Sequence, residues 1–263
     1  MTGQQIKRIR KWWHAYVRRF DAGDGELRRN MRLKEAHTLR VYKEAALIAR
    51  ALALPPEDLR LTEAMVLLHD VGRFAQYARY RTFADRLSEN HALLGLRILR
   101  QEKVLSHLPA RKQLILRRSI AYHNQAEIPP TTDRRLLFFA RLLRDADKLD
   151  IWHLMIDYYK TPPGRKNHAI AIGLPDREGV TPGVVKDLRA QRIVASRHVK
   201  NLNDLKVLQL GWVFDVNFLP TLHAAQRRGY FEKLRETLPD NADTREVYGI
   251  IRHYVAHRFE CGK

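Results

Sequence analysis

Apolar side chains recur every three or four residues along most of the chain, which is the spacing of one face of an α-helix. At the N-terminus, Ile6, Ile9, Trp13 and Val17 follow this spacing within residues 4–20. The same pattern predicts further helices over residues 26–54, 57–71, 89–102, 110–124, 132–160, 185–200, 203–238 (broken near Pro220) and 243–259. The chain is therefore expected to have an all-α fold.

Proline and glycine mark where the predicted helices end. The helix over residues 26–54 should stop before Pro55–Pro56, and Gly72 is expected to end the next helix in a left-handed C-cap conformation. Residues 76–88 have weak periodicity and are predicted to form a loop. Residues 161–184, with four prolines and four glycines, are predicted to be mostly loop.

These boundaries predict how the chain is organised. Within the second loop, the stretch AIAIGL (residues 169–174) is predicted to be a strand or a packed extended segment. We expect an N-terminal amphipathic helix (1–25), a central helical domain (26–160), a Pro/Gly-rich linker (161–184) and a C-terminal helical extension packed on the central domain (185–263).

The composition is that of a soluble globular protein. The chain has 263 residues, of which 45% are hydrophobic and 29% charged. No apolar run approaches the roughly 20 residues that a membrane span needs, and the N-terminus is too charged for a secretory signal. The single cysteine, Cys261, has no partner for an intrachain disulfide. A reducing, cytoplasmic location is the simplest expectation.

The net charge is the unusual property of this composition. Lysine and arginine exceed aspartate and glutamate by 19. Such an excess favours polyanionic partners, including nucleic acid and phosphorylated metabolites. The cations are spread along the chain, however, so solvated helix faces explain them equally well. No helix-turn-helix, RNA-recognition or zinc-finger pattern is present.

The stretch LLHDVGR (residues 67–73) places His69 and Asp70 side by side directly after an apolar helical run. His37 lies on the predicted inner face of an earlier helix, and Asp147 lies in the middle of the most apolar helix of all. An isolated buried carboxylate is very unfavourable unless it is paired, hydrogen-bonded or bound to a metal. Each histidine alone is most simply a core or surface residue, but together these side chains form the ligand set of a divalent metal.

The same residues carry a resemblance to a known family. The pattern formed by His37, LLHDVGR, NHALLG, AYHN and RDADKLD resembles the HD-domain superfamily of metal-dependent phosphohydrolases, over roughly residues 30–160. The resemblance implies an HD-domain helical bundle in which His37, His69, Asp70 and Asp147 bind a divalent metal. It also implies that His91 and His123 hold a second ion, with Asp70 bridging the two; alternatively, His91 and His123 bind substrate phosphate.

Several departures from known subfamilies limit what the resemblance implies. The chain has neither the acidic pair of the guanosine tetraphosphate hydrolases nor the GYP tripeptide of the cyclic-di-GMP phosphodiesterases. It has Arg73 where many members have lysine, which replaces a point charge with a planar fork able to grip two phosphate oxygens. Arg73 and Lys148 are the candidate catalytic cations beside Asp70, although each could instead pair with a nearby acid.

Further polar residues are candidates for substrate binding. The candidates are Arg79 and Arg81 in the predicted loop, Asn124 beside His123, Asp150 on the face of Asp147, and Lys206 and Asp215 in the C-terminal region. Buried polar anchors are the alternative explanation for the last two, and an exposed connection is the alternative for the loop.

Together these residues predict a metal-dependent phosphohydrolase. Two ions roughly 3.5–4 Å apart can activate a bridging water near neutral pH and hold the phosphoryl oxygens against it. The expected substrate is a nucleotide or another small phosphorylated compound. The alternative is a nuclease or nucleic-acid-binding protein that uses its basic surface. Mn, Fe, Co, Ni, Mg and Zn all accept histidine and aspartate ligands, and the oligomeric state is left open.

Overall fold

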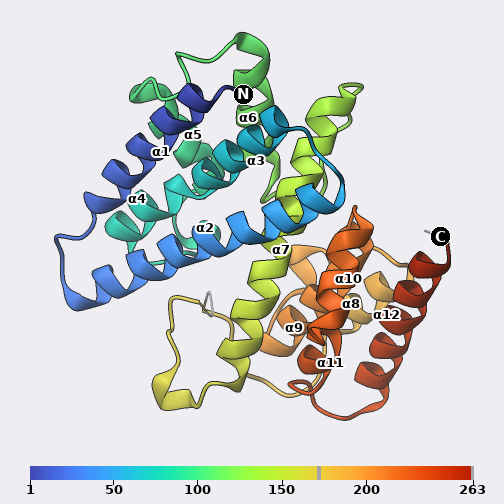
Figure 1. Ribbon diagram of the computed structural model, residues 1–263. Helices are drawn as coiled ribbons and strands as arrows, with labels where there is room; N and C mark the ends of the chain where they lie inside the picture. The colour runs from blue at the N-terminus through green and yellow to red at the C-terminus, as the bar shows by residue number, and fades with distance from the viewer. Residues whose placement is uncertain (171–172, 262–263) are drawn as a thin grey trace. The chain divides into compact units, whose positions relative to one another are not determined.

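The computed structural model describes residues 1–170 and 173–261, and every regular element among them is a helix (Figure 1). This confirms the predicted all-α fold. The proposed strand over 169–174 involves residues 171–172, which lie outside the described part of the chain. No helix of the described part is long and apolar enough to cross a membrane. The chain divides into two compact units, Met1–Asp150 and Ile151–Lys263.

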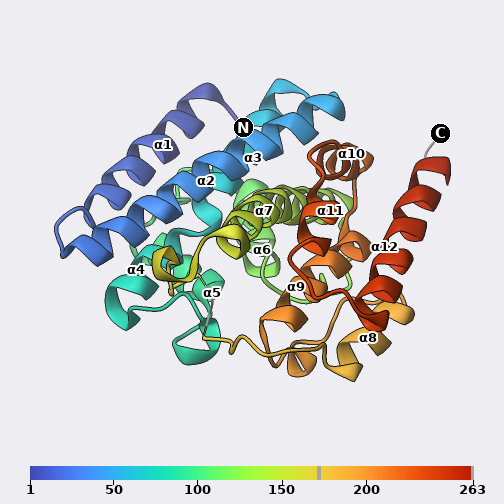
Figure 2. The ribbon, with the colours of Figure 1, turned by 90° about the horizontal axis from the view of Figure 1, so that it is seen from below.

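The first unit is built around α3. Its elements are α1 (Gly3–Arg18), α2 (Gly25–Ala51), α3 (Pro56–His69), α4 (Val71–Tyr80), the 3-10 turn η1 (Asp85–Leu87), α5 (His91–Gln101), α6 (Ala110–Tyr122) and the part of α7 (Arg134–Lys160) that ends at Asp150. Helices α1, α2, α4, α5 and α6 all contact α3, and α1, α2 and α3 lie side by side in both views (Figures 1 and 2). Residues 61–70 are consequently all buried.

Local sequence signals set where these helices begin. The Asp24 side chain accepts a hydrogen bond from the backbone N–H of Leu27 and caps α2. Asn90 caps α5 in the same way through the N–H of Leu93. Pro56 opens α3, a position where its missing N–H would have no helical partner. The caps of α2 and α5 fix the register in which His37 and His91 face inward.

Gly72 does not end a helix in a left-handed conformation, so that prediction is wrong. Helix α3 ends at His69, the chain turns at Asp70 (φ −108°, ψ 15°), and α4 starts at the next residue. Gly72 lies inside α4, where a Cβ atom would fall 2.0 Å from the carbonyl oxygen of His91 and 2.7 Å from the backbone nitrogen of Gly95. The glycine is required by the close approach of α4 and α5.

The predicted loop over residues 76–88 is also partly wrong. Helix α4 continues to Tyr80, and η1 occupies Asp85–Leu87. The apolar face of α4 consists of Val71, Phe74 and Tyr77, all fully buried. Two of these three residues precede residue 76, so the helical spacing of the apolar side chains cannot be recognised within residues 76–88 alone. Arg81 ends the helix in the left-handed conformation expected for Gly72.

The second unit is also helical. After the remainder of α7 it contains η2 (Pro163–Arg165), α8 (Pro182–Arg189), η3 (Ser196–His198), α9 (Leu202–Gly211), η4 (Trp212–Asp215), α10 (Leu219–Arg227), α11 (Tyr230–Arg235) and α12 (Ala242–Cys261). Helix α12 packs against α8, α9 and α10. The predicted break near Pro220 is confirmed, because Pro220 lies in the first turn of α10.

The predicted helix over 185–200 is wrong beyond Arg189, where α8 ends. Gln191 adopts a left-handed conformation (φ 52°) that the helix cannot continue through. The Asp187 carboxylate then accepts hydrogen bonds from the backbone N–H of Ala195 (3.0 Å) and from Nδ1 of His198 (2.7 Å). These bonds hold the segment from Ala195 to His198 against α8.

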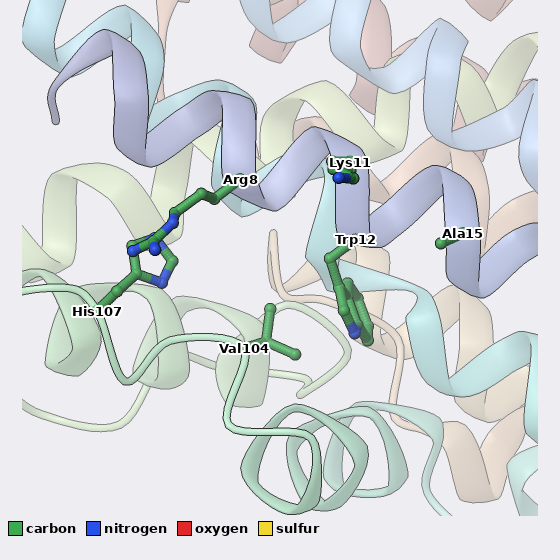
Figure 3. A pocket seen from close by; sticks show the side chains of 6 residues that line it. All are labelled: Arg8, Lys11, Trp12, Ala15, Val104 and His107. Carbon is green, nitrogen blue, oxygen red and sulfur yellow. The ribbon is translucent and has the colours of Figure 1, made fainter.

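A surface hollow of about 370 Å³ lies in the first unit, between α1 and the segment after α5 (Figure 3). It is lined by Arg8, Lys11, Trp12, Ala15, Val104 and His107. None of the candidate site residues contributes to this lining.

Candidate metal centre

Six predicted ligands meet inside the first unit. They are His37 on α2, His69 at the end of α3, Asp70 at the junction of α3 and α4, His91 at the start of α5, His123 directly after α6, and Asp147 on α7. All are buried except Asp147, whose side chain is 14% exposed. Their ligand atoms form three overlapping groups, each within 4.8 Å, that have the spacing of metal ligands.

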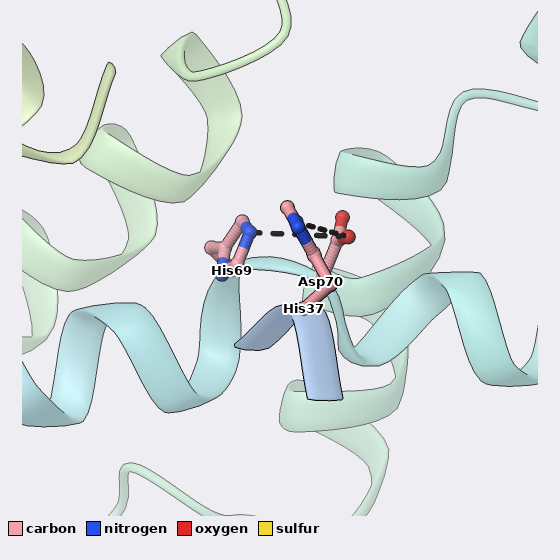
Figure 4. A group of neighbouring side chains, drawn as sticks. All are labelled: His37, His69 and Asp70. Atoms are coloured by element: carbon pink, nitrogen blue, oxygen red, sulfur yellow. Dashed lines mark ion pairs between the residues drawn. The ribbon is translucent and has the colours of Figure 1, made fainter. Parts of the chain in front are cut away.

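The Asp70 carboxylate lies between two pairs of imidazoles. Its Oδ2 is 3.4 Å from Nε2 of His37 and 3.8 Å from Nε2 of His69 (Figure 4). Its Oδ1 is 3.4 Å from Nε2 of His91 and 3.8 Å from Nε2 of His123. One carboxylate therefore presents a separate oxygen to each pair.

Asp147 lies beside the pair His37 and His69; with Oδ2 of Asp70 these side chains form what we call the first group, and His91, His123 and Oδ1 of Asp70 form the second. Oδ1 of Asp147 lies 3.2 Å from Nε2 of His37 and 3.8 Å from Nε2 of His69. The first group thus has two imidazole nitrogens and two carboxylate oxygens, whereas the second has two imidazole nitrogens and one carboxylate oxygen. The two groups differ in both charge and number of ligand atoms.

The outer nitrogen of each imidazole already has a partner. Nδ1 of His69 and Nδ1 of His123 each lie 2.7 Å from a main-chain carbonyl oxygen, three residues earlier in each case. Nδ1 of His37 lies 2.6 Å from Asp150 Oδ2, and Nδ1 of His91 lies 2.8 Å from Asp85 Oδ2. Because carbonyl and carboxylate oxygens accept, we assign the proton to Nδ1 in all four rings, which leaves every Nε2 facing the centre.

The ring nitrogens that face the centre fit a cation between them. Nε2 of His91 and Nε2 of His123 are 3.0 Å apart. Burial lowers the pKa of His91 to about 4 and that of His123 to about 3, so both rings are neutral at pH 7 and direct lone pairs at each other. Nε2 of His69 is buried with no hydrogen-bond partner among the described residues. Imidazole and carboxylate donors of this kind suit a borderline or hard divalent ion.

The carboxylates of the centre are kept ionised by the cations beside them. Burial alone would raise the pKa of Asp70, but Lys34 and the surrounding histidines hold it well below its usual range. Burial and Lys34 lower the pKa of His37, whereas Asp147, Asp150 and Asp70 raise it to about 10. In the metal-free protein His37 therefore carries a second proton, on Nε2. This proton has to leave before Nε2 can bind an ion.

Two residues of the centre are missing from the sequence-based prediction. The Nζ atom of Lys34 lies 2.9 Å from Asp70 Oδ2, and the only signal for it is its position one helical turn before His37. Asp85 contacts His91 from six residues earlier in the chain. Asp85 lies in the segment predicted to be a loop, and no sequence motif identifies it.

Arg73, a predicted catalytic cation, is engaged with the protein itself. Its Nη1 donates to Gln76 Oε1 (2.9 Å), to the carbonyl oxygen of Phe83 (2.5 Å) and to Asp85 Oδ1 (2.8 Å). Its Nε lies 3.7 Å from Asp70 Oδ1. Arg73 thus borders the centre while binding the segment after α4.

The other predicted residues of the first unit lie at different distances from the centre. Lys148 is buried on α7 next to Asp147. Arg81 pairs with Asp24 (2.8 Å), and the guanidinium of Arg79 lies over the ring of Tyr80. No described ion pair or hydrogen bond joins Arg79 or Arg81 to the six clustered side chains.

Asn124 and Asp150 lie directly behind the imidazoles. The Asn124 amide donates to Asp85 Oδ2 (3.2 Å). The Asp150 carboxylate accepts from His37 and from Arg40 Nε (2.5 Å). Asp150 therefore contacts a clustered imidazole directly, whereas Asn124 contacts the carboxylate that supports another.

Lys206 and Asp215 belong to the second unit. The Nζ atom of Lys206 donates to Asn203 Oδ1 (3.0 Å) and to the carbonyl oxygen of Thr237 (2.8 Å). Asp215 ends η4, where its carbonyl oxygen accepts a hydrogen bond from Asn217. The bonds of Lys206 fit the alternative of a buried polar anchor.

Comparison with known families agrees with this geometry. Residues 35–152 match the family model described as HD domain, and the matched range contains all six clustered side chains. No curated protein and no solved structure matches the chain. Residues 35–152 therefore form an HD domain, the domain of the HD superfamily of metal-dependent phosphohydrolases.

Proposed function

We propose that the chain hydrolyses a phosphate ester of a nucleotide or another small phosphorylated compound at a centre of two divalent ions. The observation that supports this proposal most strongly is the Asp70 carboxylate, whose two oxygens face two different pairs of imidazoles. A bridging carboxylate of this kind is what a two-ion site for phosphoryl chemistry requires.

Each clustered side chain then has a role. His37, His69, Asp147 and Oδ2 of Asp70 would hold the first ion, and Oδ1 of Asp70 with the Nε2 atoms of His91 and His123 would hold the second. Bound divalent ions supply an activated water and polarise the phosphoryl oxygens. Burial of the ligands keeps their orientation fixed and excludes other water. Electrostatic interactions with the substrate are therefore stronger than they would be in bulk water.

Lys34 is the cation best placed to meet the substrate phosphate. Its side chain is 13% exposed and its Nζ lies against Asp70. Once that carboxylate binds cations, the ammonium needs another anion, and a phosphoryl oxygen is the one that substrate supplies. Its Nζ also lies over the ring of Phe83, 5.3 Å from the ring centre.

Replacing Lys34 with methionine should lower kcat/KM by about 10²-fold, because it removes a charge held against Asp70 and keeps an unbranched side chain of similar length. Steady-state kinetics on the metal-loaded protein measure the effect. Lys43→Met, which changes an exposed lysine of the same helix, is the matched control. If Lys34→Met and Lys43→Met have equal kcat/KM, Lys34 does not contact the phosphate.

The proposed activity is tested by loading the protein with Mn²⁺ and screening mono-, di-, tri- and cyclic nucleotides for hydrolysis. We expect turnover of at least one class, loss of turnover on chelation, and recovery when Mn²⁺ is restored. His69→Ala should not recover, because it removes the fully buried ring that closes the first group. Hydrolysis at the same rate with and without chelator would show that the activity is not metal-dependent.

A nuclease activity is the alternative, and the net charge of +19 favours it. Contacts between basic residues and a phosphate backbone weaken steeply as salt is raised. Short DNA and RNA oligonucleotides therefore belong in the same screen, at low and at physiological salt. Salt-sensitive cleavage of oligonucleotides without turnover of free nucleotides would favour the nuclease.

A further inference from the structure

The four imidazoles of the centre differ in what supports them from behind. His69 and His123 donate to main-chain carbonyl oxygens, whereas His37 and His91 donate to the carboxylates of Asp150 and Asp85. His37 belongs to the first group of ligands and His91 to the second. Each group therefore contains one imidazole supported by a carboxylate and one supported by a carbonyl.

Asp85 is held in place by an extensive set of hydrogen bonds. Its Oδ1 accepts from Arg73 Nη1 (2.8 Å) and from Gln76 Nε2 (2.9 Å), and its Oδ2 accepts from Asn124 Nδ2 (3.2 Å). These donors come from α4 and from the segment after α6. Asp85 belongs to η1, so the donors fix the segment between α4 and α5 in the position from which its carboxylate reaches His91.

Asp150 is fixed in a comparable way on the other side of the centre. Its Oδ1 accepts from Arg40 Nε (2.5 Å), and its Oδ2 lies 2.6 Å from Nδ1 of His37. Arg40 lies one helical turn after His37 on α2, and Asp150 lies one turn after Asp147 on α7. An arginine thus anchors the supporting carboxylate on each side, Arg40 for Asp150 and Arg73 for Asp85.

We propose that Asp85 and Asp150 are positioning residues, each of which strengthens the binding of a different ion. Asp85 orients His91 for the second ion, and Asp150 orients His37 for the first. A carboxylate that accepts from Nδ1 fixes the ring orientation and strengthens Nε2 as a donor. The inference rests on the proposed two-ion centre. It also gives Arg73 a task, which is to hold Asp85 in place.

The test is a pair of isosteric variants, Asp85→Asn and Asp150→Asn, each titrated with Mn²⁺ by calorimetry. The amide keeps the shape of the side chain and removes its charge. We expect Asp85→Asn to weaken the second binding step by about 10–100-fold and to leave the first unchanged. Asp150→Asn should weaken the first step by a similar factor. EPR, which distinguishes an isolated Mn²⁺ ion from a coupled pair, assigns the steps independently of activity.

Asp187→Asn is the matched control, because Asp187 supports His198 through a bond of 2.7 Å in the second unit and no clustered ligand is involved. The affinities of both Mn²⁺-binding steps of Asp187→Asn should match those of the wild type. Asp85→Glu, which retains a carboxylate, should recover part of the second step. Thermal melting checks that each variant is folded. If Asp85→Asn is unfolded, Arg73→Gln is used in its place and should weaken the second binding step. If Asp150→Asn is unfolded, Arg40→Gln is used and should weaken the first.

The outcomes separate this inference from the proposed function. If the wild type binds two ions and hydrolyses nucleotides while Asp85→Asn and Asp150→Asn give wild-type isotherms, the positioning roles are overturned and the function stands. If both variants weaken the same step, the assignment of one carboxylate to each ion is overturned. If the variants weaken different steps and the wild type hydrolyses no phosphate ester, the positioning roles stand and the proposed function fails.

Discussion

Replacing Asp70 with alanine should abolish binding of both ions and lower kcat by about a thousandfold or more, which corresponds to about 4 kcal/mol of transition-state stabilisation. The reason is geometric. Both carboxylate oxygens are in use, Oδ2 beside His37 and His69 and Oδ1 beside His91 and His123. Loss of this one side chain therefore removes an anionic ligand from each group. Metal analysis after reconstitution and initial-rate kinetics measure the two effects.

Asp58→Ala provides the control for Asp70→Ala. Asp58 is a buried aspartate of the same unit, and it pairs with Arg135 instead of the clustered side chains. Its variant should keep the metal content and the rate of the wild type even if its stability falls. Retention of two ions by Asp70→Ala would contradict the bridging role, whatever the effect on the rate.

Replacing Gly72 with alanine should lower the free energy of unfolding by about 3 kcal/mol. The added Cβ would lie 2.0 Å from the carbonyl oxygen of His91 and 2.7 Å from the backbone nitrogen of Gly95. Both atoms belong to the backbone of α5, so no side-chain rotation relieves the overlap. Helices α4 and α5 have to move apart, which also displaces His91 from the second group of ligands.

The Gly72→Ala variant is measured by denaturant unfolding, and its melting temperature should fall by about 6–12 °C. Gly25→Ala is the matched control, because Gly25 lies in the same unit and a Cβ there meets no atom within 4 Å. Its stability should stay within about 0.5 kcal/mol of the wild type. A Gly72→Ala protein as stable as Gly25→Ala would show that α4 and α5 are not tightly packed at this point.

Much of the helical architecture could be predicted from the sequence, because in most helices the amphipathic pattern extends over more than two turns. Residues 4–20 and 110–124 are examples, where the structure differs by only two residues or fewer at each end. The clustering of His37, His69, Asp70 and Asp147 could also be inferred, since each occupies a position expected to face inward. That inference required only helix faces, not the path of the chain between them.

The segment from residue 70 to residue 90 could not be predicted in the same way. The turn at Asp70 depends on tertiary packing, and Gly72 is needed there because of α5, which begins nineteen residues later in the chain. Asp85 contacts His91 only because Arg73, Gln76 and Asn124 hold it there. Such bonds join residues without any fixed spacing, so periodicity carries no information about them.

Anomalous diffraction from crystals of the Mn²⁺-loaded protein tests the central claim most directly, because it locates the ions. We expect two peaks in the anomalous difference map, one on the Oδ2 side of Asp70 near His37, His69 and Asp147, the other on the Oδ1 side near His91 and His123. An ordered centre with no peak at either position would contradict the account.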